Sequence, residues 1–297
     1  MVALTRIGLI VNRSKPRAFE ISREIIQIIE GNGEKVYVEA ETAKALGRSD
    51  IQLPVHEFAH SVDLVFVLGG DGTLLGVARQ LAHAKLPVLG INLGHLGFLA
   101  EAEPKDLHKA IERIIRRDYS LEERLMLEVE VVREGKSIGT WIGLNDVGIA
   151  KRSFGRMVNV RVFVDSMYVD EYSGDGVIVS SPTGSTAYSL SCGGPIVSPQ
   201  MNAIVVTPIS PHTLVSRPFL VSGEQTVKVE VCSTHNDIGL TVDGQVNVPI
   251  QCNDVILVRK STCSTLLVKW QERGFFNVLR TKLHMNPMSE QRCEGNE

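Results

Sequence analysis

Apolar residues follow two different periods along the chain. In the first 118 residues, short β-branched runs alternate with segments whose apolar residues recur every three or four positions. These patterns predict strands at 6–12, 36–39, 63–68 and 87–91, and helices at 14–31, 73–84 and 104–115. Ser14 is the expected N-cap of the first helix. Strands that alternate with helices predict an α/β domain with a parallel, Rossmann-like sheet covered by helices on both faces.

After residue 119 the apolar period shortens to two, as in strands with one buried face. Alternation predicts strands at 125–133, 158–164 and 226–232, with shorter strands at 177–179, 203–207, 239–243, 254–258 and 266–270. We expect these strands to form an all-β sandwich. Helical spacing returns at 274–284, and we expect this helix to pack back on the N-terminal domain. The predicted domains are 1–120 (α/β), 121–270 (β-rich) and 271–297 (C-terminal helix and frayed tail).

Composition narrows the classes of partner. The 31 Lys and Arg residues against 34 Asp and Glu residues give a net charge of −3, and only 5% of residues are aromatic. Nucleic-acid binding needs a basic or stacking surface, so we expect no nucleic-acid partner. No apolar run reaches the ~20 residues of a membrane span, so we expect no membrane partner. The five cysteines include no Cys-x-x-Cys pair, which favours reduced thiols in the cytoplasm over disulfides or a zinc site.

The first chemically distinctive segment is Gly69-Gly70-Asp71-Gly72-Thr73, which follows the strand at 63–68 and opens the next helix. Backbone amides and the helix dipole at such a turn favour an anionic group, most often phosphate. An aspartate beside a phosphate can hold Mg²⁺ or accept a proton from an attacking hydroxyl. The alternative is a structural turn in which Thr73 caps the helix. The spacing fits neither the dinucleotide fingerprint nor a Walker loop, and Gly135-Lys136-Ser137 is predicted to be a hairpin turn.

A second polar cluster spans residues 174–196. Six serine and threonine hydroxyls lie within 180–189. This density favours contacts with sugar hydroxyls, amides or phosphates, and Asp175 suits a pair of ribose hydroxyls. A Ser/Thr-rich turn without function is the alternative. Asn145-Asp146 is another polar pair, and His95, in the glycine loop at 92–99, is a candidate phosphate contact or simply an exposed loop residue.

Taken together, these segments closely resemble the NAD kinases of bacteria. The matching segments are 69–73, 92–99, 145–146, 174–196, 216–218 and 243–245, in the family's order and across almost the whole chain. The resemblance implies ATP-dependent phosphorylation of the adenosine ribose 2′-hydroxyl of NAD⁺, which gives NADP⁺. It also implies a site between the two domains, a homo-oligomer (dimer or tetramer), and Mg²⁺ bound with ATP rather than by a cluster of protein ligands.

The resemblance also assigns roles to single residues. Asp71 matches the family's proton acceptor and Gly72 its neighbour at the substrate, while Asn145 and Asp146 match the pair that holds the NAD adenosine. The other implied NAD-binding residues are Arg156, Ser173, Asp175, Thr186, Ala187, Tyr188, Ser189, Leu190, Ser191 and Gln245, some of them acting across a subunit interface, and Gly69, Gly70 and Thr73 form the phosphate loop.

Two positions depart from the family pattern. Asp146 replaces the usual glutamate, which shortens the reach by one methylene and leaves room for a bridging water. Ser173 stands where some relatives carry arginine, so a choice between NAD⁺ and NADH based on that charge is in doubt.

Two other functions fit part of the pattern. Gly-Gly-Asp-Gly also occurs in lipid and sugar kinases, although no basic amphipathic helix predicts a membrane surface here. A non-catalytic regulator that binds NAD(P) would share the binding residues, but it would have no need of Asp71 beside a phosphate. The phosphoryl donor, ATP or polyphosphate, stays open at this point.

Overall fold

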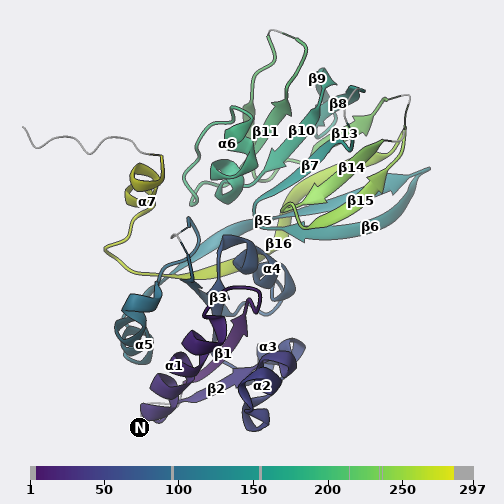
Figure 1. The fold of residues 1–297 in the computed structure, drawn as a ribbon. Helices are drawn as coiled ribbons and strands as arrows, with labels where there is room; N and C mark the ends of the chain where they lie inside the picture. The colour runs from purple at the N-terminus through teal and green to yellow at the C-terminus, as the bar shows by residue number, and fades with distance from the viewer. Residues whose placement is uncertain are drawn as a thin grey trace, which may run out of the picture.

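The chain folds into two sheets, and the helices of its N-terminal part lie around one end (Figure 1). The computed structural model describes residues 5–94, 97–153, 156–213, 215–233, 235 and 237–283. The N-terminal elements are β1 (Arg6–Val11), α1 (Ala18–Gly31), β2 (Lys35–Val38), α2 (Ala40–Leu46), α3 (Phe58–Ser61), β3 (Leu64–Gly69), α4 (Asp71–Gln80), β4 (Pro87–Asn92) and α5 (Leu107–Ile115). The later elements are β5 (Ser120–Arg133), β6 (Lys136–Gly143), β7 (Asp146–Lys151), β8 (Val158–Val164), β9 (Met167–Gly174), β10 (Gly176–Ser180), α6 (Tyr188–Ser191), β11 (Ala203–Ile209), β12 (Phe219–Ser222), β13 (Val227–Val231), β14 (Ile238–Val242), β15 (Val246–Ile250), β16 (Val255–Lys269) and α7 (Phe275–Lys282).

The N-terminal part is a parallel sheet with helices on both faces. β1 pairs in parallel with β2 and β3, and β3 pairs in parallel with β4. Successive side chains of a strand point to opposite faces. Ile7 and Leu9 accordingly lie in one core with α1 and α5, whereas Ile10 lies in a second core with α3 and α4. The predicted α/β fold is confirmed.

The C-terminal part is an antiparallel β sandwich. A six-stranded sheet, in the order β12-β11-β10-β7-β14-β15, packs on strands of the larger sheet. Val158, Val160 and Val162 of β8 are fully buried in the core between the sheets, as the alternating pattern predicts. The hairpin predicted at Gly135 is also confirmed, since β5 pairs with β6 and Gly135 has the positive φ (76°) that such turns favour.

Strand β16 joins the two parts of the molecule. It pairs in parallel with β4 at Leu266 and Leu267, and antiparallel with β5 and β13. Two short strands were predicted at 254–258 and 266–270, which is wrong because the two runs belong to one strand of 15 residues. Polar residues between the runs hide the continuity, and the register with β5 shifts between Lys260 and Ser264. The larger sheet, in the order β2-β1-β3-β4-β16-β13-β8-β9, therefore passes from the α/β part into the sandwich.

Two predicted helix starts are wrong. α1 begins at Ala18, because Arg17 takes a left-handed conformation (φ 61°), and the Ser14 hydroxyl donates to Asn12 Oδ1 at 2.7 Å instead of capping the helix. α4 begins at Asp71, two residues before the predicted start, so the aspartate of the glycine loop belongs to the first helical turn.

Figure 1 shows the C-terminal helix α7 on the side of the molecule where α6 lies, well separated from α1 and α5. The packing of α7 on the N-terminal domain stays a prediction. Among the described helices, none combines the length and apolar character needed to cross a membrane.

Gly90 sets how closely α4 can approach the sheet. A Cβ at this position would lie 2.7 Å from Leu74 Cδ1 of α4 and 2.9 Å from the backbone of Ala100. We predict that Gly90→Ala lowers the free energy of unfolding by about 1–3 kcal/mol, because α4 must move outward. Urea unfolding monitored by circular dichroism measures the change. The control is Gly31→Ala, where a Cβ meets nothing within 4 Å, and a loss as large in this control would contradict the explanation.

Candidate active site

The glycine loop connects the carboxyl end of β3 to the N-terminus of α4. Gly70 is extended and stands at the N-cap, and its N–H donates to Thr73 Oγ1 at 3.5 Å. Asn12, just after β1, donates from Nδ2 to the same oxygen at 2.9 Å. The carboxyl ends of neighbouring parallel strands thus meet at one edge of the sheet, where ligands of such folds bind. The N-terminus of α4 opens onto this edge.

Asp71 is held by the loop that follows β4. Its carboxylate accepts the N–H of Phe98 at 2.8 Å and the N–H of Leu99 at 3.3 Å, one on each oxygen. A carboxylate offers about four lone-pair positions, so each oxygen keeps one for another donor. The two amides therefore fix the direction of the Asp71 carboxylate while leaving it able to accept a proton.

A cleft of about 730 Å³ lies over the glycine loop. This volume is in the range of small-molecule sites. Its lining residues are Asn12, Lys15, Gly70, Asp71, Gly72, Thr73, Gly76, Val77, Gln80 and Gln245. Lys15 is the only cationic residue in this set, so backbone amides and the helix N-terminus supply most of the attraction for an anion.

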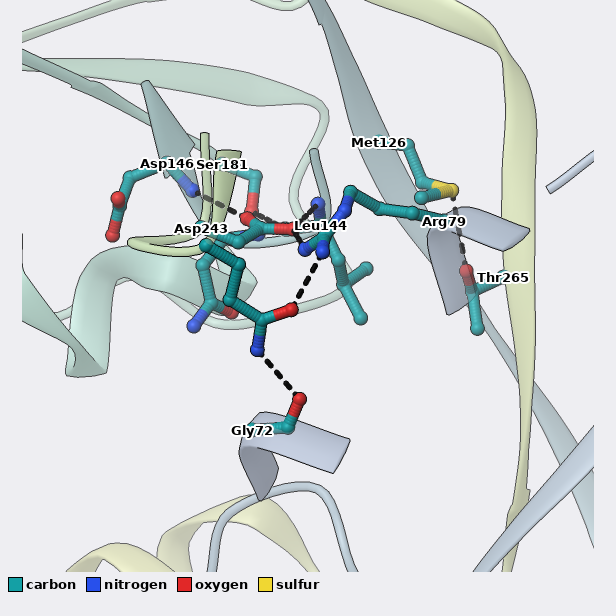
Figure 2. A network of polar contacts seen from close by, with 10 residues as sticks. Gly72, Arg79, Met126, Leu144, Asp146, Ser181, Asp243 and Thr265 are labelled. Carbon is teal, nitrogen blue, oxygen red and sulfur yellow. Dashed lines mark hydrogen bonds and ion pairs between the residues drawn. The ribbon is translucent and has the colours of Figure 1, made fainter. Parts of the chain in front are cut away.

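Gln245, from the turn between β14 and β15, brings the sandwich to the cleft. Its Nε2 donates to the Gly72 carbonyl at 2.7 Å, and its Oε1 accepts from Arg79 Nη2 at 2.5 Å (Figure 2). Arg79 Nη1 lies 2.9 Å from Asp243 Oδ2. The structure thus brings the predicted residues Asp71, Gly72 and Gln245 to one cleft between the α/β part and the sandwich.

The hydroxyls of the second cluster mostly serve the fold. Ser181 Oγ donates to the Leu144 carbonyl at 2.5 Å, and Ser185 Oγ donates to the Pro182 carbonyl at 2.7 Å. Ser189 and Thr207 share a buried hydrogen bond of 2.9 Å. Hydroxyl density was interpreted as a sign of ligand contacts, but a buried turn has backbone carbonyls that need donors, and these serines supply them.

The remaining side chains of the second cluster stay accessible to different degrees. Tyr188 and Ser191 are exposed, while Thr186, Ala187 and Leu190 are half-buried. The Thr186 hydroxyl donates to the Thr183 carbonyl at 3.2 Å. These residues form the outer surface of the short turn and helix that follow β10.

Three predicted residues lie toward the β9 side of the sandwich. Asp175, between β9 and β10, forms an ion pair of 2.5 Å with Lys151. Ser173 lies in β9 with its Oγ 3.7 Å from Met157 Sδ, and Arg156 is exposed before β8. None of the three belongs to the lining of the cleft at α4. His95 lies outside the described residues.

Asn145 and Asp146 stand at the start of β7, on the floor beneath the second cluster. The Asn145 carbonyl accepts the N–H of Ser181 at 2.8 Å, which joins the two segments. Asp146 is buried, with 6% of its surface exposed. Burial, and secondarily the negative charge of Asp243, raises the pKa of Asp146 from 3.8 to about 7.

Several residues of this region were not predicted from the sequence. Asn12, Lys15 and Gln80 line the cleft, and Arg79 connects it to the sandwich. A signal existed for Asn12, because it ends the predicted strand at 6–12 while the glycine loop follows the predicted strand at 63–68, and parallel strands end at the same edge. The described residues contain no group of three or more His, Cys, Asp or Glu side chains that could hold a metal ion.

Comparison with known proteins decides the family. Residues 7–119 match the family model of the ATP-NAD kinase N-terminal domain, and residues 144–270 match that of the ATP-NAD kinase C-terminal domain. The chain belongs to the NAD kinase family. It is 44% identical over 277 residues to the NAD kinase of Heliobacterium modesticaldum, covering 93% of this chain and 98% of that one. It is also 44% identical over 280 residues to the NAD kinase of Moorella thermoacetica, covering 94% and 89%.

Solved structures of NAD kinases have the same fold. The yeast NADH kinase complexed with NADH superposes with a TM-score of 0.88 at 26% identity, covering 98% of this chain and 90% of that chain. The NAD kinase from Archaeoglobus fulgidus in complex with ATP superposes with a TM-score of 0.75 at 23% identity, covering 95% and 100%. This second likeness concerns the fold alone.

The buried Asp146 carboxyl should make stability depend on pH. Because its folded-state pKa is raised from 3.8 to about 7, the unfolded chain ionises first, and this group lowers the stability of the native protein as pH rises from 4 to 7. We compare the free energy of unfolding of Asp146→Asn with that of the native protein at each pH. We predict that the variant's value minus the native value increases by at most about 4 kcal/mol between pH 4 and 7.

Urea unfolding at pH 4.5, 6 and 8 measures this difference. The control is Asp118→Asn, whose carboxyl is largely exposed (64% of the side chain). A stability difference between Asp146→Asn and the native protein that is the same at all three pH values would contradict the prediction.

Proposed function

We propose that this NAD kinase transfers the γ-phosphoryl group of magnesium-ATP to the 2′-hydroxyl of the adenosine ribose of NAD⁺. The observation that carries the proposal is the Asp71 carboxylate, aimed by two backbone amides and placed in the first turn of α4 beside the cleft. The amides of that turn suit phosphate oxygens, so donor phosphates and a proton acceptor share one place. Family membership points to the same reaction.

The transfer requires the protein to accept one proton and to position the reacting groups. A bond forms between the ribose O2′ and the γ-phosphorus, the bond from that phosphorus to the ADP oxygen breaks, and the hydroxyl proton passes to the Asp71 carboxylate. Phosphoryl transfer of this kind depends chiefly on positioning and charge stabilisation. A Mg²⁺ ion bound to the ATP phosphates would need few protein ligands, which is consistent with a cleft that offers one carboxylate, hydroxyls and amides rather than a cluster of acidic residues.

The residues that recognise NAD⁺ are proposed on family grounds together with their placement. Asn145 and Asp146 would hold the adenosine, and the exposed Tyr188 would stack or donate a hydrogen bond. Further contacts would come from Arg156, Ser173, Asp175, Thr186, Ala187, Ser189, Leu190 and Ser191. The ion pair of Asp175 with Lys151 and the buried Ser189 hydroxyl mean that these two residues would act after rearrangement or through their backbone.

Assembly and location complete the proposal. The protein would act as a homo-oligomer, with part of the 186–191 segment contributed by a second copy. Exposed apolar side chains in the sandwich, among them Met167, Tyr168 and Val215, support a surface for self-association. The described thiols of Cys192, Cys232 and Cys263 are free, which is consistent with a cytoplasmic protein. A lipid or sugar kinase is not favoured by the comparisons, and a non-catalytic regulator is separated from an enzyme by turnover.

Removing the proton acceptor should slow turnover without unfolding the protein. We predict that Asp71→Asn lowers kcat about 10²- to 10⁴-fold, the usual contribution of a general base, and leaves the KM for NAD⁺ nearly unchanged. The measurement is NADP(H) formation with NAD⁺ and NADH crossed against ATP and polyphosphate. The control is Asp50→Asn, an exposed aspartate whose carboxylate bonds Arg48 at the protein surface.

Two outcomes would contradict different claims. A near-normal kcat for Asp71→Asn would remove Asp71 as the base while leaving the reaction in place. Formation of no NADP(H) by the native protein in any combination of substrates would overturn the proposed function.

A further inference from the structure

Asp243 occupies a tight turn whose side chain is fully enclosed. Asp243 and Gly244 both have positive φ (51° and 63°), and the Gln245 N–H donates to the Val242 carbonyl at 3.0 Å. These values are typical of a type I′ hairpin turn, in which Asp-Gly is favoured. The Asp243 side chain has 0% of its surface exposed. A carboxylate in that position must be satisfied by protein groups.

Four donors satisfy the Asp243 carboxylate. Oδ1 accepts the N–H of Asn145 at 2.7 Å and of Asp146 at 3.2 Å, while Oδ2 accepts the N–H of Leu144 at 3.0 Å and Nη1 of Arg79 at 2.9 Å (Figure 2). These fill the four lone-pair positions of a carboxylate. Asp243 therefore has no acceptor capacity for a substrate, and its contacts act on other residues of the site.

The contacts of Asp243 act on the residues at which the sandwich meets the phosphate loop. Three successive amides fix the backbone that presents Asn145 and Asp146. Arg79 lies on α4, about two turns from Asp71, and it bonds both Asp243 and Gln245. Gln245 then returns to the Gly72 carbonyl. α4 and the start of β7 are thus tied to each other through one turn.

We propose that Asp243 is a positioning residue that, together with Arg79, sets the Asn145-Asp146 turn relative to the helix that carries Asp71. The inference deepens the proposed function, on which it rests. Asparagine is the matched replacement, because it keeps the size but offers one acceptor oxygen and turns two donors toward amides and a guanidinium.

The first experiment is steady-state kinetics of Asp243→Asn with each substrate varied. We expect the KM for NAD⁺ to rise about 10- to 100-fold, in line with the loss of buried hydrogen bonds to a charge, and the KM for ATP to stay within about two-fold. The matched control is Asp254→Asn. Asp254 is also fully buried, bonds Arg133 and accepts the Gln251 N–H at 2.8 Å, but it lies beyond the far end of β15. It should lower stability and leave both KM values unchanged.

A second pair of variants keeps the inference testable if Asp243→Asn does not fold. Arg79→Met leaves the three amides bonded and removes the contacts of the Arg79 guanidinium with Asp243 and Gln245. We expect its KM for NAD⁺ to rise about 3- to 10-fold and Arg79→Lys to restore most of the loss. KM values for NAD⁺ that stay native in both Asp243→Asn and Arg79→Met would overturn the inference. Equal rises in the KM for NAD⁺ and ATP would do so too, because they indicate general loosening.

Hydrogen exchange separates this inference from the proposed function. The amides of residues 144–146 should exchange at least about ten times faster in Asp243→Asn than in the native protein, whereas Asp254→Asn should leave them protected. This readout needs no turnover. If the native protein makes no NADP(H), the proposed function fails while the exchange still tests the anchoring of the turn, and unchanged protection in Asp243→Asn would overturn that anchoring.

Discussion

A carboxylate removed from solvent needs a donor for each lone pair, and Asp243 meets this requirement with groups from two other parts of the chain. Because the donors are the amides of residues 144–146 and a guanidinium on α4, the fold cannot satisfy Asp243 unless the β6–β7 turn, the β14–β15 turn and α4 come together. An unpaired buried charge costs several kcal/mol. The constraint therefore selects one arrangement of the α/β part and the sandwich, the arrangement in which the cleft forms.

A second constraint keeps that arrangement stiff. β16 pairs with β4 of the parallel sheet and with β5 and β13 of the sandwich, so one hydrogen-bonded sheet crosses both parts. The buried ion pair between Lys269, the last residue of β16, and Glu101 reinforces the junction at 2.6 Å. Hinge motion between domains usually occurs at linkers crossed by few contacts. A continuous sheet offers no such linker at β16, which leaves side-chain networks and loops to adjust to a substrate.

The sequence was sufficient for most of the elements and for the chemistry nearest the glycine loop. β-branched runs and helical spacing located most strands and helices, and the loop at 69–73 is indeed at the lining of a cleft. Failures occurred where long-range contacts decide the outcome. The polar residues in the middle of β16 predict a break between two strands, yet the strand is continuous because it pairs with β5 on both sides of them. The serines of 180–189 look like ligand contacts, but their partners are carbonyls such as that of Leu144, about 40 residues away in sequence. Arg79 and Asp243, 164 residues apart, give no local signal of their contact.

The balance of charge around Asp146 indicates how the site could respond to a ligand. The Arg79 guanidinium forms its ion pair with Asp243 and not with Asp146. The Asp146 carboxyl points away from Asp243 (Figure 2), and its pKa is raised to about 7 mainly by burial. Hydrogen bonds donated to a carboxylate favour its charged form. A ligand rich in hydroxyl or amine donors would therefore lower the pKa of Asp146 as it binds, and deprotonation would strengthen those same bonds. The proposed recognition of an adenosine at this position and the ionisation of Asp146 would thus be linked in free energy, whichever occurs first.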